Sequence, residues 1–491
     1  MANVSMKLNQ ELSRFFVEPI VILLIVILTA AILLVPNITR PDNILPGTES
    51  YFHLRIANTI LEEKGIIGFD DLSYGGRLIL TPIGWPLSLA LSSFIANASL
   101  LQISKILPFI LGLISIVLFY LILKKLQLPK EIRIVAALAL IISPAFIYLF
   151  TTSNWYTLPV LLNLLAFYLF LFDQKRITTV ILFFVSAFGI LNSLIGLLLL
   201  LVYILVTKKT ALKWFFITLL LVIISLTYQH LPLITNTDLL RTQILEKPET
   251  YHQLISDLGG RISLSIFAII LSILGILTTW KKKYTYTVLH LTAICLTILV
   301  FFFVPVILYL NLLLSIITSF GVIRIIKRKW ESKLIKNFTV LILILGLIFS
   351  GLSHINETKE ILPNKPIIDG LEYIKEHTKE DEVVLSHYSN GIWINTVAGR
   401  KNVIDENFKY APKLNQRLSD VNTVFYSRGI ENTTKVIDRY EITYIFITPN
   451  MKNGLVWTEE EQGLLFILEF SKNFKKIYDK DSVEVWKVIK S

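Results

Sequence analysis

The feature that most constrains this chain is a series of apolar runs, most of them about 20 residues long, which is the length of a helix that crosses a bilayer. Only 17% of the 491 residues are charged, against about 25% in an ordinary soluble domain. We therefore expect a polytopic α-helical membrane protein and exclude a water-soluble enzyme. The expected eleven spans are 17–36, 105–123, 132–150, 156–172, 177–190, 192–206, 211–229, 262–280, 285–303, 305–323 and 337–353.

Three short apolar stretches leave room for interpretation. Runs 177–190 and 192–206 meet near Asn192 and Ser193, so they are either a tight helical hairpin or one broken helix, and the second reading lowers the count to ten. Residues 82–97 are short and contain two prolines, which favours an interfacial or half-buried helix over a further span.

The distribution of Lys and Arg predicts the orientation. With a cytoplasmic N-terminus and eleven spans, 20 of the 28 basic residues in 1–356 lie in cytoplasmic loops, as the positive-inside rule requires. The first run is too long for a signal peptide and lacks a cleavage site, so we expect a retained anchor. Loops 37–104 and 230–261 and the C-terminal part then lie outside the cell membrane. Ten spans would place the C-terminal part inside.

The composition changes near Asn356. Residues 357–491 carry 19 basic and 21 acidic residues and contain no run long enough to span a membrane. We expect a transmembrane domain over 1–356 and a soluble, extracytoplasmic α/β domain over 357–491. The basic excess belongs to the membrane part, which argues against a nucleic-acid partner. In the C-terminal domain the expected helices are 366–378, 430–440 and 458–471. The expected strands there are 382–385, 442–447, 474–478 and 482–489.

The charged residues point to the outer surface as the place for chemistry. The spans hold very few ionisable residues, which argues against an ion-coupled transporter. Ten of the fifteen acids in 1–356 lie in the two long outer loops. This pattern is typical of a polar site at the outer face, although acids are also simply tolerated in outer loops.

The first outer loop contains Pro-Gly-Thr-Glu-Ser-Tyr-Phe-His-Leu-Arg over 46–55 and Asp-Asp-Leu-Ser-Tyr-Gly-Gly-Arg over 70–77. In these segments the chain resembles the GT-C superfamily of membrane glycosyltransferases, particularly the catalytic subunit of archaeal oligosaccharyltransferase. The resemblance implies a GT-C-like fold and places Glu49 where the family has a catalytic acid, usually Asp, that binds a divalent cation.

Elementary chemistry qualifies these roles. Glu49 and His53 would share one face of a helix, but Mg²⁺ or Mn²⁺ needs several oxygen ligands, so Glu49 alone is not a metal site. We expect His53, Arg55 and Arg77 to be substrate-binding candidates. The two arginines would hold a lipid-linked phosphate, or equally bind a lipid headgroup or form a local salt bridge.

Other family motifs are altered. The segment 153–158, where the family carries an acidic pair, has no carboxylate. Thr-Gln-Ile-Leu-Glu over 242–246 resembles a family motif that ends in a catalytic glutamate, which implies a role for Glu246 at the acceptor. The family's Trp-Trp-Asp-Tyr-Gly, which reads a glycosylation sequon, corresponds to His-Tyr-Ser-Asn-Gly over 387–391. Three substrate-binding candidates follow from this segment: His387, Tyr388 and Ser389.

The expected function is transfer of a sugar or oligosaccharide from a polyprenyl-phosphate or polyprenyl-pyrophosphate donor in the lipid bilayer to a protein or glycan acceptor on the outer face. The alternative is a catalytically inactive paralogue that binds lipid-linked glycans or a partner enzyme. Loss of the acidic pair favours the alternative. Loss of the sequon reader fits either reading, because related enzymes that use other acceptors also lack it.

Overall fold

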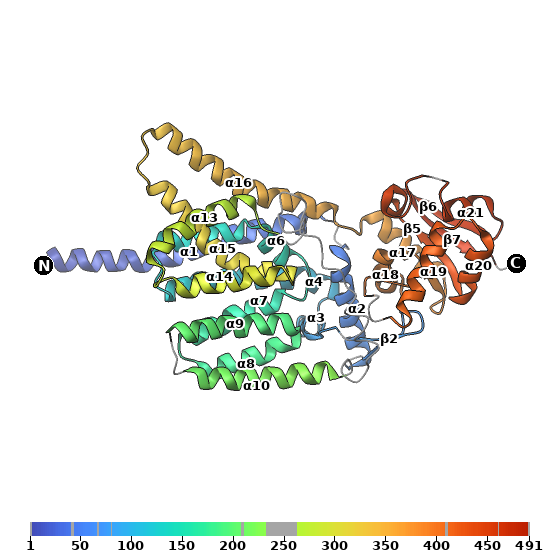
Figure 1. Ribbon diagram of the computed structural model, residues 1–491, viewed down its shortest axis with the longest axis horizontal. Helices are drawn as coiled ribbons and strands as arrows, with labels where there is room; N and C mark the ends of the chain where they lie inside the picture. Colours follow the sequence, from blue (N-terminus) through green and yellow to red (C-terminus); the bar gives the residue numbers. More distant parts are fainter. Residues whose placement is uncertain are drawn as a thin grey trace.

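A helical bundle is followed by a compact α/β domain at one end of it (Figure 1). The computed structural model describes residues 2–40, 44–65, 68–79, 81–207, 211–231, 263–407, 411–459 and 461–489, and only the backbone of 2–17 and Lys359. The bundle helices are α1 (Ala2–Thr39), α4 (Leu100–Lys125), α5 (Lys130–Ile141), α6 (Pro144–Thr151), α7 (Thr157–Leu171), α8 (Lys175–Val185), α9 (Ile190–Thr207), α10 (Leu212–Gln229), α13 (Ile266–Thr279), α14 (Thr287–Val300), α15 (Ile307–Lys327) and α16 (Lys333–Glu360).

Six helical segments in the described part of the chain are long and apolar enough to cross a membrane. They are Glu18–Thr39, Leu100–Lys125, Ile190–Thr207, Leu212–Gln229, Val304–Lys327 and Lys333–Thr358, and the bent pair α5 and α6 would make a seventh. Each of the eleven expected spans contains a helix. The number eleven itself is not confirmed, because the remaining expected spans contain shorter helices. The protein is nonetheless a membrane protein.

The expected single span 132–150 is wrong in one respect. It is divided into α5 and α6, whose axes differ by 61°. Pro144 opens α6, and the Ser143 hydroxyl accepts a hydrogen bond from the backbone N–H of Phe146. A proline cannot supply the N–H that a continuous helix needs, and a serine cap satisfies the new helix end, so the chain bends here.

The structure also decides between the two readings of 177–206. Helices α8 and α9 form a tight hairpin around Gly189, whose φ of +99° suits glycine. Leu182 of α8 packs so closely against Gly196 of α9 that a Cβ at this glycine would lie 2.8 Å from the leucine Cδ2. The side chains on both sides of the turn therefore fold back on one another.

Two glycines allow a close contact between α13 and α15. A Cβ on Gly275 would collide with the carbonyl oxygen of Ile317, and a Cβ on Gly321 would collide with that of Leu271. Small residues permit such backbone approach in membranes, where packing rather than water exclusion holds helices together.

A helix and a short hairpin of the loop that follows α1 lie between the bundle and the α/β domain (Figure 1). Helix α2 (Gly47–Glu63) and the hairpin of β1 (Phe69–Asp70) and β2 (Arg77–Leu78) face that domain, and α3 (Gly84–Ala96) packs on the bundle. Trp85 and Leu89 of α3 are buried, whereas Phe94 and Ile95 are about four-fifths exposed. The half-buried helix expected at 82–97 is therefore present.

The C-terminal domain begins as α16 leaves the bundle (Figure 1). Its elements are α17 (Lys365–His377), β3 (Val383–Leu385), α18 (Tyr388–Trp393), β4 (Lys401–Asn402), α19 (Leu414–Tyr426), α20 (Ile430–Arg439), β5 (Ile442–Ile447), α21 (Leu464–Phe470), β6 (Phe474–Lys480) and β7 (Val483–Val488). The sheet has the order β4-β3-β5-β7-β6, with β3 parallel to β4 and β5 and with β7 antiparallel to β5 and β6.

The loop that follows α1 is joined to the edge of this sheet. Ser73 forms a parallel bridge with Asn402 of β4, the Tyr74 N–H donates to the Asn402 carbonyl at 2.9 Å, and the Asn402 N–H donates to the Leu72 carbonyl at 3.1 Å. A loop of the helical bundle thus continues the sheet of the α/β domain, and the two parts share one interface.

Candidate active site

Helix α2 presents Glu49 and His53 on one face, as their spacing predicts. The helix follows Pro46, whose extended backbone precedes Gly47 at a φ of +72°. Glu49 lies in the first turn, where a negative charge is favoured by the helix dipole. The backbone N–H of Trp155 donates to the Glu49 Oε1 at 3.1 Å, and the Glu49 side chain remains 31% exposed.

His53 is fully buried beside this carboxylate. Its ring packs edge-on against Phe52 and Trp155, and its Nε2 lies 3.6 Å from the Glu49 Oε1. Neither ring nitrogen has a hydrogen-bond partner among the described residues. Burial lowers the pKa of His53, while the nearby Glu49 partly offsets that effect. The imidazole is therefore neutral at pH 7.

Glu49 opens into a cavity of about 290 Å³, which we call the Glu49 cavity. Segment 46–50 forms one wall of the cavity. Helix α6 and the residues after it form a second wall, and Ile361 and Glu406 close the cavity. Its lining residues are Pro46, Gly47, Thr48, Glu49, Ser50, Tyr148, Thr152, Ser153, Ile361 and Glu406. The segment 153–158, which lacks the expected acidic pair, thus lies beside Glu49 and contributes a hydroxyl group.

Glu406 is a functional candidate that the sequence did not indicate. It follows β4 in the C-terminal domain, yet its Oε2 accepts a hydrogen bond from the Thr48 hydroxyl beside Glu49. The two residues are 358 positions apart. Only the packing of the domain against the first loop brings this carboxylate to the cavity.

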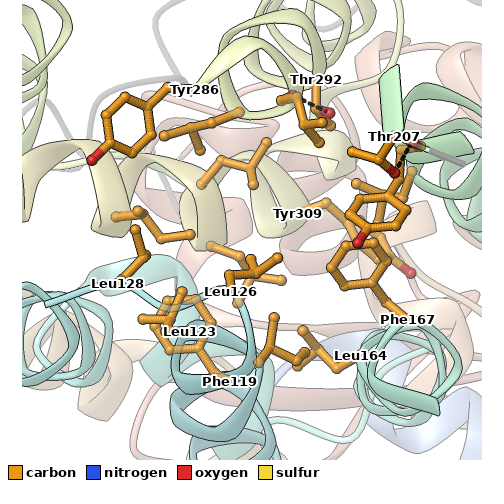
Figure 2. A pocket seen from close by; sticks show the side chains of 18 of the residues that line it. Phe119, Leu123, Leu126, Leu128, Leu164, Phe167, Thr207, Tyr286, Thr292 and Tyr309 are labelled. Carbon is orange, nitrogen blue, oxygen red and sulfur yellow. Dashed lines mark hydrogen bonds between the residues drawn. The ribbon is translucent and has the colours of Figure 1, made fainter. Parts of the chain in front are cut away.

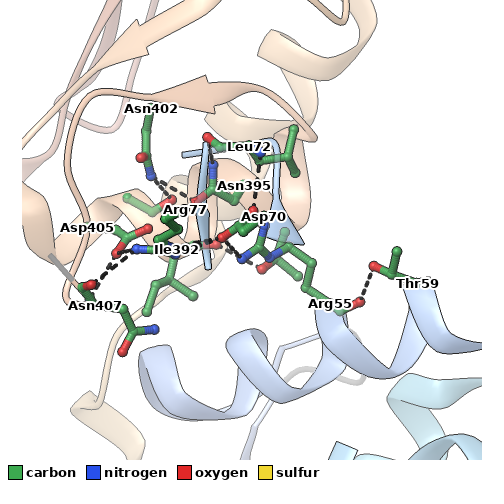
Figure 3. A network of polar contacts seen from close by, with 12 residues as sticks. Arg55, Thr59, Asp70, Leu72, Arg77, Ile392, Asn395, Asn402, Asp405 and Asn407 are labelled. Atoms are coloured by element: carbon green, nitrogen blue, oxygen red, sulfur yellow. Dashed lines mark hydrogen bonds and ion pairs between the residues drawn. The ribbon is translucent and has the colours of Figure 1, made fainter. Parts of the chain in front are cut away.

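Arg55 and Arg77 belong to a separate buried network (Figure 3). Arg55 binds both oxygens of Asp70, at 2.7 and 2.8 Å. Arg77 contacts Asp70 at 2.8 Å and Asp405 of the C-terminal domain at 2.6 Å. We call these four residues the Asp70 network. Among the roles weighed for the two arginines, the structure shows local salt bridges, and neither arginine lines the Glu49 cavity.

The opposite charges in this network stabilise one another and shift the pKa values of Asp70 and Arg77. Burial alone would raise the pKa of Asp70, but the hydrogen bonds and charges of Arg55 and Arg77 hold that pKa well below its usual range. Burial would likewise lower the pKa of Arg77, and the carboxylates of Asp405 and Asp70 raise it instead. Asp70 and Arg77 are therefore both charged at neutral pH and stabilise each other's charge.

A different arginine has a buried guanidinium nitrogen without a hydrogen-bond partner among the described residues. Arg40, just beyond the first span, is 9% exposed, and its Nη2 has no hydrogen-bond partner in the described part of the chain. Burial lowers its pKa to about 10, so the guanidinium stays charged at neutral pH. Sequence reasoning assigned Arg40 only to the outer side, since its burial depends on the packing of α2.

The candidates of the C-terminal domain lie elsewhere. The His387 Nδ1 lies 2.8 Å from the Ser389 hydroxyl and accepts from the Ser389 N–H at 3.3 Å, so this pair caps α18. Burial lowers the pKa of His387, and the exposed ring of Tyr388 contacts the His387 ring at a tilt of 38°. None of the three lines the Glu49 cavity.

The remaining predictions concern metal ligands and Glu246. Glu246 lies outside the described residues. Within the described ranges, no three His, Cys, Asp or Glu side chains are grouped so that they alone could hold a metal ion. A cation at Glu49 would therefore need ligands from water or substrate.

An apolar pocket of about 430 Å³ lies inside the bundle, lined from α4, α7, α9, α14 and α15 (Figure 2). Leu123, Leu164 and Phe167 surround its open centre. The hydroxyl of Tyr309 forms its most buried polar point, where it donates to Asn192 and accepts from Asn163.

No protein-family model and no curated protein sequence matches this chain. Several solved structures are similar to this chain. The oligosaccharyltransferase of Archaeoglobus fulgidus superposes with a TM-score of 0.64 at 14% identity, over 93% of this chain and 73% of that one. The arabinofuranosyltransferase AftD from Mycobacteria gives 0.63 at 11% identity, over 95% and 40% of the two chains.

A third structure, ArnT from Cupriavidus metallidurans bound to undecaprenyl phosphate, has a TM-score of 0.55 at 11% identity, over 94% of this chain and 97% of that one. All three are GT-C glycosyltransferases. The archaeal oligosaccharyltransferase has also been solved with an inhibitory peptide and a dolichol-phosphate. The similarity extends over nearly the whole chain and confirms the expected GT-C resemblance at the level of the fold.

Proposed function

Because this chain has the fold of the GT-C glycosyltransferases, we propose that it transfers a sugar or oligosaccharide from a polyprenyl-phosphate or polyprenyl-pyrophosphate donor to an acceptor on the outer face of the membrane. The observation that carries the proposal is the Glu49 cavity, a polar space at the junction of the bundle and the C-terminal domain. Neighbouring structures that hold dolichol-phosphate and undecaprenyl phosphate support a lipid donor. A membrane site suits a donor whose tail stays in the bilayer.

The proposed reaction inverts the anomeric carbon. The acceptor nucleophile forms a bond to that carbon as the bond from the carbon to the phosphate oxygen breaks, and the electron pair leaves with the phosphate. The acceptor proton passes to a carboxylate base. Glu49 remains the predicted metal-binding or base carboxylate, and Glu246 remains the predicted second acid, at the acceptor.

The environment of Glu49 suits that task. The Trp155 N–H fixes one carboxylate oxygen, and the neutral, buried His53 supports the helix face from which Glu49 projects. The oxygen-rich lining fits a hard cation, and Mg²⁺ or Mn²⁺ bound at Glu49 would supply positive charge to the departing phosphate. The Asp70 network holds the first loop against the C-terminal domain, so the cavity keeps its walls.

The test measures transfer of labelled sugar from polyprenyl-linked donors in membranes that contain the wild-type protein or Glu49→Gln, with and without Mn²⁺ or Mg²⁺. We expect at least a hundredfold loss in this variant. Glu62→Gln is the matched control, because Glu62 is an exposed acid on the same helix. Transfer by Glu49→Gln at the wild-type rate would refute the role of this carboxylate.

A catalytically inactive, glycan-binding paralogue is the second candidate. The lack of a carboxylate in 153–158, beside Glu49, favours it. It predicts no transfer from any donor above empty membranes, together with retention of lipid-linked glycan by the folded, purified protein in native mass spectrometry.

A further inference from the structure

The apolar pocket inside the bundle, which we call the bundle pocket, is distinct from the Glu49 cavity (Figure 2). Its volume is about 430 Å³, no charged side chain is among its described lining residues, and it shares no lining residue with the Glu49 cavity. Helices in a membrane associate mainly through close packing, and an unfilled apolar space loses those contacts. An apolar occupant would restore them.

The hydroxyl groups deep in the bundle pocket already have hydrogen-bond partners within the protein. The Tyr309 hydroxyl donates to the Asn192 Oδ1 at 2.8 Å and accepts from the Asn163 Nδ2 at 3.1 Å. The Asn163 Oδ1 lies against Gly196, where an added Cβ would be 2.3 Å from it. The Thr292 hydroxyl donates to a backbone carbonyl of its own helix at 2.7 Å. The interior therefore suits a hydrocarbon chain better than a sugar or a phosphate.

The bundle pocket opens at the end of the bundle that lies away from the C-terminal domain (Figure 1). Its exposed lining residues are all at this end, where α4 and α9 finish and just before α14 begins: Leu126, Gln127, Pro129, Thr207 and Thr285. The other lining residues are buried or half-buried. A lipid that inserted a chain here would therefore keep its headgroup at this end of the bundle.

Lysines flank this opening. Lys125 and Lys130 directly precede and follow the segment 126–129, and three consecutive lysines at 281–283 lie just before α14. All five are exposed, and none of them has an ion pair among the described residues. The Lys125 ammonium lies 3.8 Å from the centre of the Phe172 ring, a contact that does not neutralise its charge. Basic pockets between membrane helices are typical sites for anionic lipid headgroups.

We propose that the bundle pocket binds one acyl chain of an anionic phospholipid, whose phosphate lies among Lys125, Lys130 and the lysines at 281–283. The polyprenyl tail of the sugar donor fits these observations less well, because its phosphate belongs at the Glu49 cavity and would leave the lysines without an anion. The phospholipid belongs to the leaflet away from the C-terminal domain, which is the cytoplasmic leaflet in the expected orientation. Its binding does not depend on sugar transfer.

The experiment titrates the purified full-length protein in detergent with dioleoyl phosphatidylglycerol or dioleoyl phosphatidylcholine and measures bound lipid by native mass spectrometry. We expect the anionic lipid to bind about tenfold more tightly. Leu164→Trp, which fills the centre of the bundle pocket, should weaken that binding at least tenfold. Leu220→Trp, at an exposed position of α10, is the matched control and should bind within twofold of wild type. Thermal unfolding of each variant establishes that it is folded.

The headgroup is tested with the same two lipids. Replacing both Lys125 and Lys130 by Gln should reduce the preference for phosphatidylglycerol to less than threefold, because the opening loses two charges. Replacing Lys472 and Lys475 by Gln removes two exposed lysines of the C-terminal domain and should preserve the preference. A phosphatidylglycerol with a diazirine in one acyl chain locates the site in the wild-type protein, where we expect cross-links to α4, α7 and α14.

Three outcomes overturn the proposal: equal affinity of the wild-type protein for the two lipids, wild-type affinity in folded Leu164→Trp, or cross-links only to residues outside the lining of the bundle pocket. Loss of the cross-links in the presence of an equal concentration of polyprenyl phosphate would also overturn it, since the pocket would then hold the tail of the donor. The proposed function fails separately. Phosphatidylglycerol binding in the pocket, without sugar transfer from any donor, supports the lipid site and rejects the transferase.

Discussion

Two acidic regions lie where the helical bundle meets the C-terminal domain, and their charges are arranged in opposite ways. In the Asp70 network each carboxylate has an arginine partner, and Asp70 and Arg77 are almost completely buried. In the Glu49 cavity the described lining offers two carboxylates and no arginine or lysine. Breaking a buried, mutually compensated pair destabilises a fold, whereas carboxylates that line an open polar space are suited to a ligand.

The largest expected loss of stability comes from replacing Arg77, whose guanidinium group binds both Asp70 and Asp405. Arg77→Met leaves Asp405 buried without its counterion, and breaking a buried pair costs about 3–5 kcal/mol. We expect this loss in the free energy of unfolding in detergent, with faster proteolysis after α16. Arg439→Met, which breaks the exposed pair with Asp420, is the control and should change little. If Arg77→Met unfolded at the same denaturant concentration as wild type, the Asp70 network would not stabilise the fold.

Acid should weaken the same network. The pKa of Asp70 is held below its unfolded value of 3.8, so its contribution to stability is fully present above that pH and is lost as the pH falls through the folded pKa. The unfolding midpoint of wild type should therefore drop more steeply below pH 3.8 than that of Asp70→Asn. If the unfolding midpoints of wild type and Asp70→Asn fell equally with pH, a group other than Asp70 would cause the acid sensitivity.

Arg55→Met should have a smaller effect than Arg77→Met. Arg55 contacts Asp70 alone, and Arg77 still compensates that carboxylate after the substitution. Loss of charged hydrogen bonds of this kind costs about 1.5–3 kcal/mol. Denaturant unfolding of the two variants and the double variant tests the order, and a larger loss for Arg55→Met would contradict it.

The smallest effect on stability, and the sharpest contrast, is expected in the Glu49 cavity. Glu49→Gln keeps the side-chain shape and an oxygen that accepts from the Trp155 N–H, so the free energy of unfolding should change by less than about 1 kcal/mol. Sugar transfer should nevertheless fall at least a hundredfold. Equal losses of stability and activity would erase the distinction between the two regions.

Local pattern was sufficient for most of the elements. The segments expected at 366–378, 430–440 and 442–447 correspond to α17, α20 and β5 within one or two residues, because amphipathic periodicity is encoded in neighbouring residues. The bend at Pro144 was missed although a proline stood in the middle of the run. Apolar composition dominated that interpretation, and the cap by Ser143 was read only from the structure.

The candidate site was only partly predictable. Glu49 and His53 share a helix face, so their proximity followed from spacing alone. The contacts of Arg55 and Arg77 did not follow from spacing. The local sequence does not distinguish an arginine that binds phosphate from one that binds Asp70. His387, Tyr388 and Ser389 matched a motif in order, but none of them lines the cavity.

The sequence by itself determined that the chain enters a membrane and that Glu49 and His53 share a helix face, since length, polarity and helical period act over short distances. Only the tertiary structure decided which charges meet. Arg77 and Asp405 are 328 positions apart, and Thr48 and Glu406 are 358 apart. Such pairs form when the first loop adds to the edge of the C-terminal sheet, and their Coulomb energy depends on distances and burial that no local pattern encodes.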